Sequence, residues 1–218
     1  MEKITRFIQK NFKKIIFVFC LIGFILLAED VFNKELMNGD VIGYKFISTY
    51  LMNDNVTKVM KIITWFGSGY CFLTITLLLF ILVKNKKICF YNLFNLVTVT
   101  SLNQLLKLIL HRPRPDEFQI ITETGYSFPS GHSMVSLAFY GYLVYLIYKY
   151  INNKHLKRTL IIILSVLICV IGVSRIYLGV HYTSDVLGGF LISFAYLIIY
   201  IELVNKFVLE KNKDDRKE

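Results

Sequence analysis

Apolar residues in this chain gather in six long stretches separated by short polar segments. The stretches cover residues 15–28, 62–83, 88–106, 127–148, 159–174 and 186–205. A helix needs about 20 apolar residues to cross a bilayer, and the second, third and fourth stretches reach that length. The other three are shorter, so they need flanking Lys and Arg stems that extend to the interface; for each of them a buried helix is the alternative. The pattern predicts six membrane-spanning helices.

The positive charges give an independent prediction of orientation. With the amino terminus in the cytoplasm, the inside segments hold 17 Lys and Arg residues and the outside segments hold 8. Because Lys and Arg concentrate in cytoplasmic loops, both termini are expected inside, which requires an even number of spans. The first stretch leads into Glu29 and Asp30 without a small-residue cleavage site, so we expect a retained signal anchor.

The region between the first two stretches carries apolar residues at helical spacing. Ile42, Phe46, Ile47, Tyr50 and Leu51 form one such stripe, and a second runs from Val56 to Ile63. Stripes of this kind indicate helices that lie in the membrane interface or pack against the bundle. The predicted fold class is therefore all-α: a six-helix membrane bundle with interfacial helices between spans one and two, forming a single domain over residues 1–218.

Composition and charge support a membrane protein. The chain is 55% hydrophobic and 18% charged, whereas soluble domains hold about 25% charged residues. The net charge of +10 would also suit nucleic acid, but the basic residues cluster between apolar runs, so membrane topology explains them and no nucleic-acid partner is expected. Small size and the lack of organellar signals favour a bacterial plasma membrane.

Three polar segments fall on the predicted outer face, at the ends of spans three to six. They are Lys107-Leu-Ile-Leu-His-Arg-Pro-Arg114-Pro115, Phe128-Pro129-Ser130-Gly131-His132-Ser133, and Ser174-Arg175 through His181 to Asp185. Charged groups beside membrane spans are costly and commonly mark a functional site. These segments combine cations, histidines and a helix start on one surface, which suits phosphate chemistry.

The two histidines have different neighbours. His181 and Asp185 are four residues apart, so on a helix they share a face, and the carboxylate can orient the imidazole for nucleophilic attack. Pro129, Ser130 and Gly131 predict a capped helix start, whose free amides bind anions. His132 places a titratable proton donor beside that anion site.

Lys107, Arg114 and Arg175 supply positive charge for a phosphoryl group. For Arg112 and His111 we expect only snorkelling or headgroup contact. Asp116, Glu117 and Glu123 are interpreted as solvated loop charges. No zinc pattern and no paired carboxylates for magnesium occur, so we expect neither a metal nor a cofactor.

At these residues the sequence resembles the type 2 phosphatidic acid phosphatase superfamily. Its signatures K-x6-R-P, P-S-G-H and S-R-x5-H-x3-D appear in order as Lys107…Arg114-Pro115, Pro129–His132 and Ser174-Arg175…His181…Asp185. The resemblance implies that His181 attacks phosphorus, that Asp185 orients it, and that His132 protonates the leaving lipid oxygen. It also implies that the phosphate is bound by Lys107, Arg114, Ser130, Gly131 and Arg175.

The resemblance predicts a metal-independent lipid phosphatase acting on phosphatidic acid, phosphatidylglycerol phosphate, undecaprenyl diphosphate or a similar lipid. A lipid phosphotransferase with the same site is the first alternative. A non-enzymatic anion transporter or lipid-binding scaffold is the second. Transporters usually place their polar site near the membrane midplane, whereas these motifs lie at span ends.

Overall fold

The computed structural model describes residues 2–33, 37–116 and 119–214, with side chains from residue 11 to residue 207. This part of the chain is helical and contains no strand. Its helices are α1 (Glu2–Phe32), α2 (Asn38–Tyr50), α3 (Asp54–Trp65), α4 (Gly69–Leu82), α5 (Lys86–Leu110), α6 (Gly131–Tyr150), α7 (Lys154–Tyr177) and α8 (Thr183–Asp214). The all-α prediction is confirmed for these residues.

Polar side chains set the starts of several helices. The side-chain oxygens of Asn53, Ser68, Asn85, Ser130 and Asn153 each accept a hydrogen bond from a backbone N–H in the first turn of the helix that follows. Such N-caps satisfy amides that have no partner within the helix. A lipid environment makes this satisfaction especially important.

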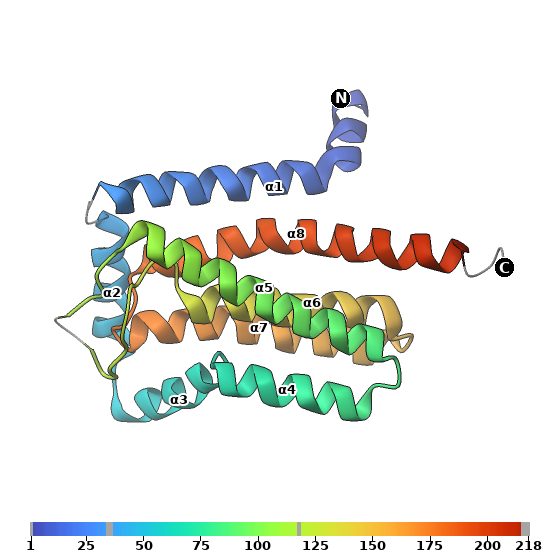
Figure 1. Ribbon diagram of the computed structural model, residues 1–218. Helices are drawn as coiled ribbons and strands as arrows, with labels where there is room; N and C mark the ends of the chain where they lie inside the picture. The colour runs from blue at the N-terminus through green and yellow to red at the C-terminus, as the bar shows by residue number, and fades with distance from the viewer. Residues whose placement is uncertain (1, 34–36, 117–118, 215–218) are drawn as a thin grey trace.

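The long helices run side by side between two ends of the bundle (Figure 1). At one end α2 lies across the bundle, beside the α5–α6 connection and the α7–α8 turn. At the other end α1 begins, α8 ends, and the α4–α5 and α6–α7 loops turn (Figure 1). The three signature segments thus share the α2 end, opposite to both termini.

Helix α6 is the centre of the bundle, because it packs against α5, α7 and α8. Met134, Ala138 and Phe139 on its first half are fully buried. Asn95 on α5 donates a 2.9 Å hydrogen bond to the carbonyl of Ala138, which ties the two helices at the level of the core.

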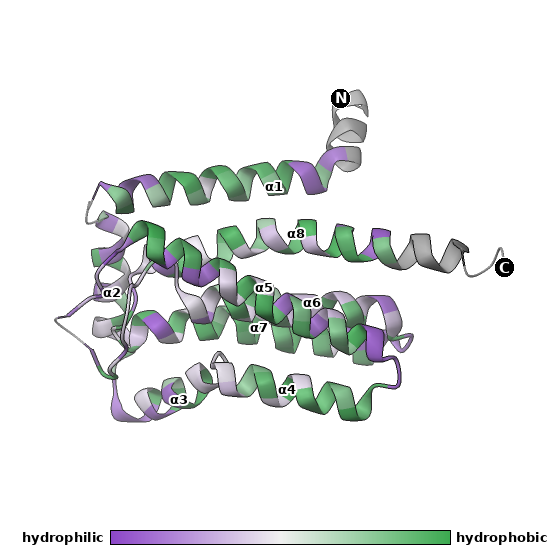
Figure 2. Ribbon diagram, viewed as in Figure 1, coloured by the Kyte–Doolittle hydropathy of each residue, from purple (hydrophilic) through white to green (hydrophobic). Residues whose placement is uncertain are grey.

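Four described helices are long and apolar enough to cross a membrane: α1 from Asn11, α5, α7, and α8 as far as Phe207. Figure 2 shows apolar residues along these helices and polar ones gathered towards both ends. The chain is thus an integral membrane protein. The bent pair α3–α4 would make a fifth span. The predicted count of six is not confirmed, since α6 begins with polar residues and is rich in tyrosine, and a helix enclosed by neighbours need not be apolar all round.

The predicted second span, residues 62–83, is not one continuous helix. Helix α3 ends at Trp65, α4 begins at Gly69, and the two are bent by 51°. The sequence between them, Phe66-Gly67-Ser68, is apolar enough to extend the hydropathy run, but Ser68 caps the new helix by accepting from the N–H of Cys71. The region between the first two spans does hold helices, as predicted: α2 and α3.

Candidate active site

A cavity of about 390 Å³ lies at the α2 end, where α5 and α7 end and α6 and α8 begin. Six of the eight predicted site residues form part of its wall: Lys107, Arg114, Gly131, His132, Arg175 and His181. The other two, Ser130 and Asp185, are fully buried and contact elements of this wall. The structure therefore brings the three signature segments together around one cavity, and the chemical role of each residue remains a prediction.

His181 is held between a carboxylate and a guanidinium. Its Nδ1 lies 3.3 Å from Asp185 Oδ2, and its Nε2 lies 3.1 Å from Arg114 Nη1. Because a guanidinium only donates hydrogen bonds, Nε2 must be the accepting nitrogen. The proton of the neutral ring is then on Nδ1 and points to Asp185, so the lone pair of Nε2 faces the cavity side.

Burial keeps His181 uncharged near neutral pH. Its side chain is almost completely enclosed. Burial lowers the pKa of His181 to about 4, although Asp185 opposes the shift through its hydrogen bond and charge. An imidazole that stays unprotonated retains the lone pair that a nucleophile needs.

Asp185 is fixed at the first turn of α8 by several donors. Besides His181, its carboxylate accepts hydrogen bonds from the N–H of Tyr182 at 2.9 Å and from Arg112 Nη1 at 2.7 Å. A buried carboxylate is stable only when paired and hydrogen-bonded. These contacts restrict the conformation of the Asp185 side chain. Because Asp185 is hydrogen-bonded to His181, they also fix the orientation of the imidazole.

The start of α6 is tied to α5 and α8. Ser130 donates its N–H to the carbonyl of Asp185 at 3.0 Å, and Asn103 Nδ2 donates to the carbonyl of Pro129 at 3.1 Å. Ser130 Oγ accepts from the N–H and the hydroxyl of Ser133, so its own proton is available to another acceptor. The first amides of α6 thus begin beside His181, with Gly131 and His132 in the cavity wall.

Two of the cations are fixed by carbonyl groups. Lys107 Nζ donates to the carbonyl of Tyr126 at 2.6 Å. Arg114 donates to the carbonyls of Gly125, Val180 and Thr124 at 2.9–3.1 Å. Burial lowers the pKa of Arg114, with Glu123 and Asp185 opposing the shift. Carbonyl partners orient these side chains without neutralising their charge.

Arg175 has a carboxylate partner, which the sequence interpretation missed. Its Nη2 donates to Glu123 Oε1 at 2.6 Å, and its Nη1 donates to Thr64 Oγ1 at 2.6 Å. Partial burial works against ionisation of Glu123, but Arg175 lowers its pKa below the usual value. The expectation that Glu123 is a solvated loop charge is wrong: it lines the cavity and pairs with Arg175.

Arg112 is the second correction, because it is a buried link and not a headgroup contact. Its Nη1 donates to Asp185 and to Ser184 Oγ, and its Nη2 donates to Asp40 of α2, each at 2.7 Å. The guanidinium also stacks on Tyr182, 4.2 Å from the ring centroid. Burial opposes the charge of Arg112, but Asp185 and Asp40 raise its pKa above the ordinary value.

Asp40 completes this link from a helix outside the signatures. It is buried, and it accepts hydrogen bonds from the N–H and the hydroxyl of Ser184 at 2.8 Å as well as from Arg112. The repeated Arg-Pro at residues 112–115 was a signal that both arginines matter. Nothing in the sequence singled out Asp40, since its partners lie 72 and 144 positions away.

The remaining loop residues lie outside the cavity wall. His111 is exposed, adopts a left-handed conformation with φ of 47° at the end of α5, and contacts the ring of Tyr126. Asp116 is exposed, as expected, and it lines a second cavity on the α2 side of His181. Glu117 falls outside the described residues.

A second cavity, of about 650 Å³, opens on the α2 side of His181. Among the described residues, His181 is the one that belongs to the walls of both cavities. The second wall is mostly apolar and includes Val41, Tyr44, Met52 and Ile176. The imidazole of His181 therefore lies between the cationic cavity and the mostly apolar cavity.

Comparisons with known proteins show which family the chain resembles. The model of the PAP2 superfamily matches residues 87–209, more than half of the chain. A segment of 91 residues, 41% of this chain, is 44% identical to phosphatidylglycerophosphatase B of Bacillus subtilis and spans 44% of that protein. Over 78% of this chain and 79% of the relative, identity to the undecaprenyl-diphosphatase of Sulfolobus acidocaldarius is 28%.

A solved structure shares the fold over nearly its whole length. The crystal structure of the transmembrane PAP2 type phosphatidylglycerolphosphate phosphatase from Bacillus subtilis matches with a TM-score of 0.77 at 29% identity. The match covers 87% of this chain and 96% of that chain.

Proposed function

The chain belongs to the PAP2 superfamily, and from this premise we propose that it hydrolyses a lipid phosphate monoester or diphosphate with His181 as nucleophile. One observation carries the proposal: the accepting nitrogen of a neutral His181, backed by Asp185, lies at a cavity lined by Lys107, Arg114 and Arg175. The relatives are named as phosphatases of phosphatidylglycerophosphate and undecaprenyl diphosphate. These lipids define the substrate class that we propose.

The charge of the cavity wall suits a phosphate. Among the described residues, three cations and one carboxylate, Glu123, line it, which gives a net charge of about +2; a phosphate monoester carries about −1.5 to −2 near neutral pH. Arginine holds two oxygens at once, while lysine acts as a point charge. The amides of Gly131 and His132 at the start of α6 add donors at a positive helix end.

In the first step Arg114 exchanges its contact with His181 Nε2 for a phosphate oxygen. Burial and the neighbouring cations lower the pKa of His132 in the substrate-free protein; in the proposed complex the negative charge of the phosphate raises that pKa again, so His132 enters the step protonated. Nε2 then forms a bond to phosphorus while the bond from phosphorus to the lipid oxygen breaks, and His132 gives its proton to that leaving oxygen. Lys107, Arg114 and Arg175 balance the charge on the equatorial oxygens, the main requirement of phosphoryl transfer. Asp185 stabilises the charge that develops on the His181 ring.

In the second step water replaces the lipid. His132, now neutral, accepts a proton from water as its oxygen bonds to phosphorus, and the bond from phosphorus to Nε2 breaks. Inorganic phosphate leaves and His181 is again neutral. The positive charge required is supplied by side chains of this chain, so the proposed reaction uses no metal and no cofactor.

The apolar cavity beside His181 is the proposed place for the lipid part. Residues of α2, Ile176 of α7 and the loops around Pro115 and Tyr182 form its wall, which meets the wall of the cationic cavity at His181. A lipid lying along α2 would bring its phosphate to His181 with its chains still in an apolar surrounding. We further propose that this end of the bundle faces outside the cytoplasm of a bacterial plasma membrane, with both termini inside, as the positive charges predict.

The test is phosphate release by the purified protein in detergent from phosphatidate, phosphatidylglycerol phosphate and undecaprenyl diphosphate, with and without a chelator. We expect release from at least one lipid, unchanged by the chelator and lost in His181→Gln. His111→Gln is the matched control, because His111 lies outside the cavity wall, and it should retain activity. Full activity in His181→Gln would overturn the proposal.

A further inference from the structure

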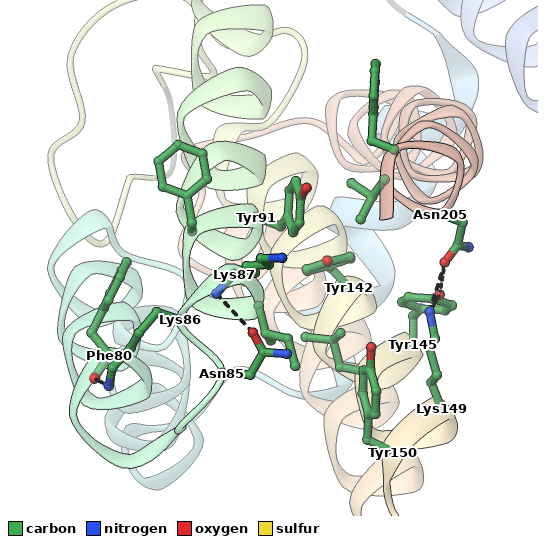
Figure 3. Close-up of a pocket in the computed structure, with 15 residues that line it drawn as sticks. Phe80, Asn85, Lys86, Lys87, Tyr91, Tyr142, Tyr145, Lys149, Tyr150 and Asn205 are labelled. Carbon is green, nitrogen blue, oxygen red and sulfur yellow. Dashed lines mark hydrogen bonds between the residues drawn. The ribbon is translucent and has the colours of Figure 1, made fainter. Parts of the chain in front are cut away.

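A third cavity lies at the end of the bundle opposite to the active site. Its volume is about 540 Å³, and it is formed by the α4–α5 loop, the start of α5, the end of α6 and α8 (Figure 3). Three lysines, Lys86, Lys87 and Lys149, line it, and none of the described residues in its wall is a carboxylate. The described part of the cavity wall is therefore cationic.

The lysines differ in what holds them. Lys86 donates to the carbonyls of Phe80 and Val83 at the end of α4. Lys149 donates to Tyr145 Oη and to Asn205 Oδ1, both at 3.0 Å, so its charge is oriented by neutral groups. Among the side chains that the structure describes, residues 11–33, 37–116 and 119–207, none is a hydrogen-bond or ion-pair partner of the Lys87 ammonium, and the Lys87 side chain is exposed.

Tyr142 is a second, independent sign of a ligand. The residue is only 1% exposed, and its hydroxyl makes no hydrogen bond to the described part of the chain. The hydroxyl oxygen itself is still reached by solvent, because it is absent from the fully buried polar atoms that have no partner. Figure 3 shows Tyr142 between Lys87 and Tyr145 in the cavity wall. A buried hydroxyl normally has a partner, and here the open side is the cavity.

The rest of the wall is aromatic and apolar. Phe80, Phe90 and Phe207 surround the polar groups, together with Tyr91 and Tyr150. Phe90 and Phe207 are both 61% exposed on the outer surface of the bundle, where lipid chains would contact them. A small soluble anion would make no favourable contact with these apolar side chains, whereas a phospholipid presents an anionic headgroup beside apolar chains.

We propose that this cavity binds the phosphate of an anionic phospholipid in the leaflet opposite to the active site. Lys87 and Lys149 pair with the phosphate, Tyr142 donates its hydroxyl to it, and the phenylalanines contact the acyl chains. The same loops are those that the charge distribution predicts to be cytoplasmic, where anionic lipids attract basic segments. This site does not depend on the proposed catalytic role of His181.

The test measures binding of palmitoyl-oleoyl phosphatidylglycerol to the full chain in a neutral detergent by native mass spectrometry, with phosphatidylcholine as the neutral lipid. The variant Lys87→Gln/Lys149→Gln is compared with Lys84→Gln/Lys154→Gln, which removes two charges from the same face outside the cavity wall. The active site is unchanged in both, so any phosphatidylglycerol bound there contributes equally.

We expect the cavity pair to lose affinity for phosphatidylglycerol by about tenfold or more, since each lysine near an anionic headgroup contributes roughly a factor of five. The control pair should lose less than about threefold, as screened surface charges do. Equal losses in both pairs, or none in either, would overturn the proposal. If millimolar inorganic phosphate displaces the lipid, the proposal that the site prefers a phospholipid to a small anion is overturned.

Tyr142→Phe keeps the ring and removes only the hydroxyl, so it also serves if the double variant does not fold. The loss of one hydrogen bond predicts about a fivefold weaker affinity. Unchanged affinity in Tyr142→Phe would contradict the placement of the headgroup in this cavity. The phosphatase activity of Tyr142→Phe, measured with no phospholipid other than the substrate, should stay at the level of the unmodified protein.

Discussion

At the scale of single residues, the site depends on where each buried charge finds its partner. Arg112 is neutralised by Asp40 and Asp185 behind the imidazole. Lys107 and Arg114 donate to carbonyl groups at the cavity, and these partners carry no negative charge. Two carboxylates, Asp40 and Asp185, thus balance Arg112, while Glu123 is paired with Arg175 in the wall that also holds Lys107 and Arg114. This arrangement leaves net positive charge in the described cavity wall, which suits the proposed phosphate.

The first prediction concerns the protonation of His181. Because burial lowers the pKa of His181 to about 4, its ring should remain neutral as pH falls from 7 to 5 and should gain a proton only near pH 4. Nitrogen NMR of the protein labelled at its four histidines, assigned with His181→Gln, measures this directly. A His181 that titrates near pH 6.5 would show that the enclosed environment described here is wrong.

The second prediction concerns Asp40. Replacing Asp40 with Asn removes one of the two carboxylates that balance Arg112, and breaking a buried ion pair costs about 3–5 kcal/mol. We expect a clear loss of thermal stability and at least a tenfold fall in kcat/KM, because Arg112 also holds Asp185. Thermal unfolding and phosphate release are the two measurements.

Asp116→Asn is the control for Asp40, since it removes the same charge from an exposed loop position. It should change stability by less than about 0.5 kcal/mol. If Asp40→Asn is as stable as Asp116→Asn, the contacts from α2 through Arg112 to Asp185 do not stabilise the protein.

At the scale of helices, the break between α3 and α4 positions His132. A Cβ atom added at Gly67 would lie 2.8 Å from His132 Cδ2 and 2.8 Å from Ile171 Cγ2. The absence of a side chain at Gly67 therefore lets the chain turn directly against the imidazole. The helix break is part of the site as well as an interruption of the span.

The third prediction follows from this contact. Gly67→Ala should push His132 from its place and lower kcat/KM by about tenfold to a hundredfold, since a displacement of roughly 1 Å can cost 10²-fold. Gly69→Ala, two residues on, would meet nothing within 4 Å and should leave activity unchanged. Equal activity in the two variants would mean that Gly67 does not position His132.

The sequence predicted the helices better than their interruptions. Hydropathy located the regions of α1, α5, α6, α7 and α8 because each is a long apolar run. It missed the end of α3, because Trp65 and Phe66 are as apolar as the helices around them and averaging conceals the Ser68 cap. The prediction of a continuous span over 62–83 failed for that reason.

The predicted site residues share one neighbourhood because their spacing places them at helix ends that meet at one end of the bundle. Arg112 and Glu123 were misread because a charge in a loop gives no sign of burial until its partner is known. Their partners, Asp40 and Arg175, are distant in sequence, and no local pattern connects them.

At the scale of the whole molecule, the two ends of the bundle differ in chemistry. One end holds the cavity proposed to bind phosphate, and the other holds the start of α1, the last described turns of α8 and the lysine-lined cavity (Figures 1 and 3). The positive charges predict that the second end is cytoplasmic.

The fourth prediction tests this orientation in intact bacterial cells. In a Cys169→Ser background, which removes the exposed native cysteine, a thiol reagent that does not cross membranes should label Asp116→Cys and not Lys154→Cys. After the cells are opened, both should be labelled. The reverse pattern in intact cells would place the active site on the cytoplasmic side.

The central claim, that His181 carries the phosphoryl group, is tested most directly by trapping the intermediate in His132→Ala. An aryl phosphate whose leaving group is stable as an anion needs no proton from His132, whereas the attack of water still needs its base. We predict that phosphate accumulates on His181, detected by mass spectrometry after an alkaline quench, and that His132→Ala/His181→Gln carries none. Phosphate bound to a different residue, or turnover by His181→Gln at the normal rate, would contradict the account.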